Sequence, residues 1–175
     1  RTGYMFAHQK YEITPDILLI AKGMGGGMPI GAFVANISLM SALAKNPALG
    51  HITTFGGHPV CVAAALATLK ALIDKPFINE VIQKERLLKT ILVHPFIKEI
   101  RSSGLFMAIT LTSNKLLTPL IDKVISKGVL IDYFLFDDSS FRIAPPLIIT
   151  PDQIRDGAMV ILAALDELMA EDIKL

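Results

Sequence analysis

Residues 15–32 read PDILLIAKGMGGGMPIGA and form the most unusual stretch of this 175-residue chain. A short apolar run at residues 17–20 is typical of a buried strand, and a lysine, Lys22, follows it after a single alanine. Five glycines then occur within residues 23–31. Glycine permits left-handed backbone conformations and lets the chain approach a neighbour or a ligand closely. The segment predicts a strand, a lysine and a glycine-rich loop, with a second strand at residues 32–35.

The residues alone leave the chemistry of this segment open. A partly desolvated lysine beside such a loop could act as an amine nucleophile toward an aldehyde. Glycine clusters are, however, mostly turns, and a single lysine is usually solvated. A phosphate-cradling loop is a third interpretation, but no Gly-Lys-Ser/Thr sequence stands at P-loop spacing and the pattern Gly-x-Gly-x-x-Gly fits only loosely.

Composition excludes several classes of partner. The net charge is +1 with acids and bases interspersed, so no basic surface for nucleic acid or for an anionic membrane is expected. Apolar residues make up 52% of the chain, but the apolar run at residues 158–165 is too short to cross a bilayer. The single cysteine, Cys61, excludes an internal disulfide framework and fits a cytoplasmic location.

The hydrophobic pattern predicts two regions. Residues 1–75 hold the strand, lysine and loop, followed by an alanine-rich helix at residues 59–73 that is apolar on nearly every side. Such a helix is expected to be buried all round, between domains or subunits. From residue 76 amphipathic helices alternate with strands, which predicts a second, smaller domain over residues 76–175.

The second region has helical and strand signals throughout. Its first helix has an apolar face made by Ile78, Val81, Ile82, Leu88, Ile91 and Leu92. Strands are expected at residues 96–100, 105–111, 129–133 and 141–143. A helix at residues 116–127 should end at Gly128. The last helix begins at Thr150, where Gln153 completes a capping box after Pro151. Its apolar face consists of Ile154, Ala158, Ile161, Leu165 and Leu168.

Residues 15–32 closely resemble the active-site segment of class III aminotransferases. In that family the lysine between the strand and the glycine-rich loop forms a Schiff base with pyridoxal 5'-phosphate and also transfers the proton during catalysis. The resemblance implies that Lys22 has both roles here. Residues 1–3, Phe6 and Tyr11 match the family segment that precedes this one.

The resemblance also implies the fold. It is an α/β fold, the PLP-dependent transferase fold type I. Residues 1–75 correspond to the C-terminal part of the large cofactor-binding domain. Residues 76–175 correspond to the small C-terminal α+β domain.

Two further segments resemble family motifs in the same order. In residues 51–59, HITTFGGHP, the resemblance makes Thr54 a ligand of the cofactor phosphate in the neighbouring subunit; without it, this threonine is a turn residue. His58 stands where the family usually has asparagine, and it is expected to start a helix. In residues 141–147, FRIAPPL, the resemblance makes Arg142 the ligand of the substrate carboxylate. Locally, a surface ion pair is the simpler interpretation of this arginine.

By resemblance the whole protein is a homodimeric transaminase, with its site at the interface, which moves an amino group between an amino acid or amine and a 2-oxo acid. An aminomutase or decarboxylase of the same fold, or a non-catalytic fragment, are the alternatives. The family's aspartate at the pyridine nitrogen, its phosphate loop and its ring-stacking aromatic residue cannot be assigned, so the sequence looks truncated at its N-terminus. Among class III aminotransferases the sequence most resembles the ornithine and acetylornithine transaminases, but it does not identify the amino donor or acceptor.

Overall fold

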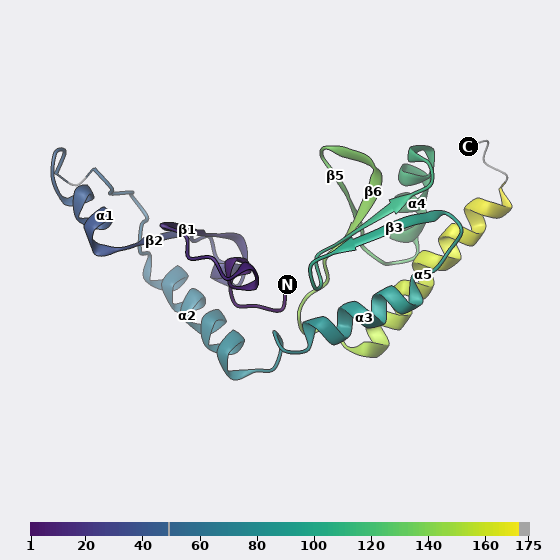
Figure 1. Ribbon diagram of the computed structural model, residues 1–175, viewed down its shortest axis with the longest axis horizontal. Helices are drawn as coiled ribbons and strands as arrows, with labels where there is room; N and C mark the ends of the chain where they lie inside the picture. The colour runs from purple at the N-terminus through teal and green to yellow at the C-terminus, as the bar shows by residue number, and fades with distance from the viewer. Residues whose placement is uncertain (49, 172–175) are drawn as a thin grey trace. The chain divides into compact units, whose positions relative to one another are not determined.

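The computed structural model describes residues 1–48 and 50–171, and the chain divides into two compact units (Figure 1). One unit is Phe6–Pro76, and the other comprises Arg1–Met5 together with the chain from Phe77 onward. The first five residues join the C-terminal unit through hydrogen bonds. The N–H of Leu105 donates to the Arg1 carbonyl at 2.9 Å, and Arg1 Nε donates to the Pro145 carbonyl at 3.0 Å.

The unit Phe6–Pro76 contains a two-stranded antiparallel sheet. Strand β1 (Ile17–Ile20) pairs with β2 (Ala32–Ala35), which confirms both strands at the residues expected from the sequence. A 3-10 helix, η1 (Ala7–Tyr11), precedes β1, and a second, η2 (Lys22–Gly25), follows it. The sequence does not predict η2, because glycine-rich segments carry no helical signal.

Helix α2 (Pro59–Asp74) confirms the expected alanine-rich helix, and η3 (Ala42–Ala44) and the short α1 (Ile37–Ser41) lie before it. The expectation that α2 is buried on all sides is wrong within this chain. Cys61 is buried, but the exposed fraction is 56% at Val60 and 64% at Ile73. Ile17 and Leu19 of β1, expected as a buried strand, are also exposed. The physical reason is that few elements of this unit pack against α2 and β1, so their remaining apolar surface has no cover here.

The C-terminal unit is built on a four-stranded antiparallel sheet (Figure 1). Its strands are β3 (Ile97–Ser102), β4 (Met107–Leu111), β5 (Asp132–Phe134) and β6 (Asp137–Ile143), in the order β3-β4-β6-β5. Residues of β4 alternate between buried and half-buried, as expected for a sheet with one face against a core.

Three helices and a 3-10 turn complete this unit: α3 (Val81–Ile91), η4 (Asn114–Leu116), α4 (Leu117–Ser126) and α5 (Pro151–Ala170). They pack on the sheet face that carries Met107, Ile109 and Phe141, all almost fully buried. The expected α5 is confirmed in detail: Thr150 Oγ1 accepts from the Gln153 N–H, and Gln153 Oε1 accepts from the Thr150 N–H. All five residues of its expected apolar face are buried.

Some element boundaries differ from the expected ones. Gly128, at φ +87°, ends α4 as expected, but the following strand begins only at Asp132 because Val129 N–H still bonds back to the Val124 carbonyl. Strand β4 begins at Met107, two residues later than expected, since the N–H of Leu105 is taken by Arg1. Both of these differences arise from a backbone hydrogen bond formed outside the sheet, whereas β6 begins at Asp137, earlier than the expected residue 141, because Asp137 already pairs with Phe134 of β5.

Candidate functional site

Lys22 lies at the end of β1, where the backbone leaves the sheet through Ala21 and enters η2. Its φ is +50°, in the left-handed region that residues with a β-carbon rarely adopt. The side chain is exposed within this chain, unlike the partly desolvated lysine expected from the sequence. A non-glycine residue in this conformation costs about 1–3 kcal/mol, and such strain concentrates at functional sites. Lys22 therefore remains the strongest candidate nucleophile in this unit.

The glycines after Lys22 bring the loop close to helix α2. Gly25 is buried, and a β-carbon there would lie 2.9 Å from Ile30 Cγ2. At Gly26, with φ +56°, a β-carbon would lie 2.2 Å from Thr68 Oγ1, on the side of α2. No side chain fits in that space. These two glycines are thus explained by packing, whereas Gly27 has open space at its β-carbon position.

Thr54 lies in the turn before α2 and lines a pocket of about 360 Å³. The lining combines residues 53–58, Cys61 of α2 and residues 29–31 of the glycine-rich segment. The structure thus brings the threonine segment and the end of the lysine segment to one hollow. Lys22 is not part of its lining. His58 precedes Pro59 as the N-cap residue of α2 without a side-chain capping bond, consistent with a helix-start position.

Arg142 lies on β6 in the C-terminal unit, directly opposite Asp132 on β5. Its Nη2 forms an ion pair with Asp132 Oδ2. The exposed fractions of the two side chains are 38% and 52%, so the pair is accessible to solvent. The ion-pair interpretation of Arg142 is therefore correct as a description, and it leaves the guanidinium open to an external carboxylate. Lys22 and Arg142 belong to different units.

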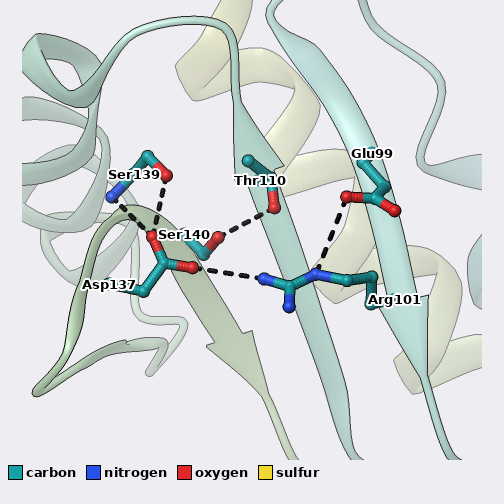
Figure 2. Close-up of polar contacts among 6 residues, drawn as sticks. All are labelled: Glu99, Arg101, Thr110, Asp137, Ser139 and Ser140. Atoms are coloured by element: carbon teal, nitrogen blue, oxygen red, sulfur yellow. Dashed lines mark hydrogen bonds and ion pairs between the residues drawn. The ribbon is translucent and has the colours of Figure 1, made fainter.

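A second polar network lies around Arg101 of β3, on the same face of the sheet as Arg142. Figure 2 shows Arg101 between Glu99 and Asp137, with Ser139 bonded to Asp137 and Ser140 to Thr110. The hydroxyls of Ser140 and Ser139, the Ser139 N–H and the Arg101 charge lower the pKa of Asp137 to about 2. Ala108 separates Arg101 from Arg142 in the register. Arg101 thus has its own carboxylates and does not share Asp132.

The lowered pKa of Asp137 predicts a pH dependence of stability. Because its folded pKa lies below that of a free aspartate, about 3.9, the charged form stabilises the fold above that pH. This contribution is lost as the pH falls toward 2. The Asp137→Asn variant should be less stable than wild type at pH 7, and the difference should shrink between about pH 4 and pH 2. A carboxyl NMR titration of Asp137 with a midpoint near 3.9 would contradict this assignment.

Sequence reasoning missed Asp132, Thr68 and the Asp137 network. In the sequence, Asp132 is a carboxylate ten residues before Arg142, and this spacing does not determine how the two strands pair. In residues 1–48 and 50–171, no three His, Cys, Asp or Glu side chains form a group that could hold a metal ion. Within the same residues, no helix has the length and apolarity needed to cross a membrane.

Solved structures of transaminases have the fold of this chain. An ornithine aminotransferase from Toxoplasma gondii superimposes with a TM-score of 0.82 and 30% sequence identity, over 98% of this chain and 41% of its own. That structure is described as having pyridoxal phosphate partially occupying its active site. The chain therefore has the fold of part of a PLP-dependent transaminase, as the resemblance implied.

The sequence matches the family model of class-III aminotransferases over residues 1–165, and the chain belongs to that family. It is 41% identical over 178 residues to an acetylornithine aminotransferase of Mycobacterium leprae, covering 98% of this chain and 42% of that protein. It is 40% identical over 185 residues to a putrescine aminotransferase of Pectobacterium atrosepticum, covering all of this chain and 39% of that protein. The chain spans about two fifths of the length of these curated relatives.

Proposed function

We propose that the protein to which this chain belongs is a transaminase that transfers an amino group between an amino acid or amine and a 2-oxo acid. The observation that carries the proposal is Lys22, held at φ +50° between β1 and the glycine-rich loop in a class-III aminotransferase chain. The relatives are named aminotransferases, which favours transamination over the aminomutase or decarboxylase alternatives.

The residues present fit pyridoxal phosphate. Lys22 offers an exposed primary amine, the group that reacts with an aldehyde. Thr54 offers a hydroxyl in a hollow of about 360 Å³ whose lining includes Gly31, Gly56 and Gly57, so backbone lies close to its wall. When bound, the cofactor withdraws electrons from the substrate carbon that loses a proton. Lys22 would hold the cofactor, and Thr54 would donate to its phosphate.

The remaining chemistry is assigned to side chains of this chain. Lys22 Nζ, once free, accepts the proton of the substrate carbon and donates it again at the next step, acting as general base and then as general acid. Arg142 binds a substrate carboxylate through the N–H groups of its planar guanidinium, and so orients the reacting carbon.

A homodimer is part of the proposal. Thr54 lines a pocket without Lys22, which agrees with a threonine that serves a neighbouring subunit. The exposed apolar residues of α2 also provide surface for a partner or for further chain. We place the protein in the cytoplasm, where the free thiol of Cys61 would persist. The amino donor is proposed as an amino acid or a diamine, since the relatives are named for acetylornithine and putrescine.

The proposed function is tested by trapping the cofactor. Full-length protein incubated with pyridoxal phosphate should turn yellow, and borohydride should remove the colour and leave the label on Lys22. Peptide mass spectrometry locates the label. A colourless protein that is indifferent to the cofactor, or a label on another lysine, would overturn the assignment.

Removing the Thr54 hydroxyl should weaken cofactor binding. The variant Thr54→Val keeps the shape but loses a hydrogen bond to a charged group, which is worth about 1.5–3 kcal/mol. The Kd for pyridoxal phosphate, measured by absorbance, should therefore rise by about ten-fold or more. Thr14→Val, at an exposed threonine of the same unit that does not line this pocket, is the matched control and should bind as wild type does. A Thr54→Val protein with unchanged affinity would remove this residue from the site.

The same variant tests whether Thr54 acts across the dimer. A mixed dimer of Lys22→Ala and Thr54→Val protomers would contain one site with both wild-type residues if they come from different chains. That site should bind pyridoxal phosphate with wild-type affinity. If both residues served the same chain's site, no mixed dimer would contain an intact site, and wild-type affinity would not return.

A further inference from the structure

Asp132 forms an ion pair with Arg142. The two residues face each other on neighbouring antiparallel strands, so their side chains lie on the same face of the sheet. Asp132 Oδ2 accepts from Arg142 Nη2, and Asp132 Oδ1 accepts from the Tyr133 N–H at 2.9 Å. Both oxygens of this carboxylate are therefore held, and one of them is held by the guanidinium.

The position of the contact on the guanidinium matters. A guanidinium pairs with both oxygens of a carboxylate either end-on, through Nη1 and Nη2, or side-on, through Nε and Nη2. Both arrangements use Nη2, the nitrogen that Asp132 contacts. An incoming carboxylate must therefore share Nη2 with Asp132 or displace Asp132 from it. The incoming carboxylate is also repelled by the negative charge of Asp132.

We propose that Asp132 is a specificity-determining residue that competes with substrate carboxylates for Arg142. The proposal rests on the proposed function, in which Arg142 is the carboxylate ligand. With Asp132 in place, a substrate without a carboxylate leaves Arg142 neutralised. A substrate with a carboxylate binds Arg142 at the cost of the internal pair. Asp132 thus weakens the binding of carboxylate-bearing donors and leaves that of plain amines unchanged, so the ratio of the two affinities becomes smaller.

The exposure of the pair makes this competition reversible. Ion pairs between solvent-exposed side chains are weak, because water screens the charges and ordering the side chains costs entropy. The Arg142 and Asp132 side chains are both more than one third exposed. A substrate carboxylate that gains two hydrogen bonds can therefore displace Asp132, at a modest loss of affinity.

The experiment compares ornithine with putrescine, which have the same amine chain and differ by one carboxylate. In the full-length holoenzyme, Asp132→Asn should lower the KM for ornithine by about 1.5-fold to five-fold, the range expected for an exposed pair, and leave the KM for putrescine unchanged. Asp138→Asn, on the adjoining strand and bonded to Asn114, is the matched control. Asp132→Ser serves as a second variant if Asp132→Asn fails to fold.

A binding measurement makes the result independent of turnover. Maleate, an unreactive dicarboxylate, is titrated into the full-length protein, and its Kd is measured by isothermal titration calorimetry, which applies equally to wild type, Asp132→Asn and Arg142→Gln. Asp132→Asn should lower the Kd for maleate by about the same factor as the KM for ornithine.

The outcomes separate the two proposals. An unchanged or raised Kd and KM in Asp132→Asn, with both raised in Arg142→Gln, would overturn the role of Asp132 and keep that of Arg142. Unchanged maleate binding in Arg142→Gln would overturn both roles. Neither result affects the transaminase function, which depends on trapping at Lys22.

Discussion

Replacing Lys22 with alanine is expected to lower the turnover number of the full-length protein by at least about 1,000-fold, because one side chain both holds the cofactor and transfers the proton. Folding should be unaffected, since the Lys22 side chain is exposed. The measurement is single-turnover kinetics with a saturating donor, together with the borohydride label, which should disappear. Pyridoxal phosphate bound through other contacts should remain dialysable.

Three matched variants make this result specific. Lys22→Arg keeps the positive charge but has no amine that reacts with an aldehyde, so it should be as inactive as Lys22→Ala. Lys45→Ala removes another exposed lysine of the same unit and should retain full activity. Lys22→Gly should be inactive yet more stable by about 1 kcal/mol, because glycine adopts the φ of +50° without strain. Retained turnover in either Lys22→Ala or Lys22→Arg would reject the assignment.

The elements with local signals could be predicted from the sequence. The capping box at Thr150 and the apolar spacing behind it are read within a few residues, and the structure confirms both. The strands on either side of Lys22 were also located to the residue, because a short apolar run ends at glycines on one side and begins after them on the other. In each case the determining interactions lie within the segment itself.

The features that depend on register or on distant packing could not be predicted. The pairing of Asp132 with Arg142 depends on a shift between Tyr133 and Phe134 in the β5–β6 pair, and no sequence pattern fixes it. The exposure of α2 depends on which elements pack against it, whereas its composition reports only that it suits burial. The close contact of Gly26 with Thr68 joins residues 42 positions apart.

That contact predicts the second large effect. Replacing Gly26 with alanine is expected to lower the free energy of unfolding by about 2–4 kcal/mol, from a left-handed φ of +56° and a β-carbon 2.2 Å from Thr68 Oγ1. Thr68 cannot rotate away without cost, because its hydroxyl donates to the Ala64 carbonyl at 2.9 Å. Gly23→Ala is the matched control, since its β-carbon would meet no atom within 4 Å and its φ is not left-handed. The measurement is urea unfolding of the full-length protein.

A double-mutant cycle separates the clash from the backbone strain. Thr68→Ala removes the oxygen in the way and leaves Thr68 Cβ at an ordinary 3.6 Å, so it should relieve the clash but not the strain at Gly26. The double variant Gly26→Ala with Thr68→Ala should therefore lose less free energy of unfolding than the two single variants lose in sum. The difference should be about 1–2 kcal/mol. Additive effects would mean that the contact with α2 is not what requires glycine.

The cycle also decides what the glycine-rich loop is for. If packing on α2 is its purpose, Gly26→Ala should lose stability and cofactor affinity together, because η2, which begins at Lys22, is shifted with the loop. Adding Thr68→Ala, which removes the clash, should then restore part of the stability and part of the cofactor affinity. A Gly26→Ala protein that unfolds as wild type does but no longer binds pyridoxal phosphate would instead favour a loop that cradles phosphate directly. The geometry at Gly26, where a β-carbon would lie 2.2 Å from Thr68 Oγ1 of α2, favours packing.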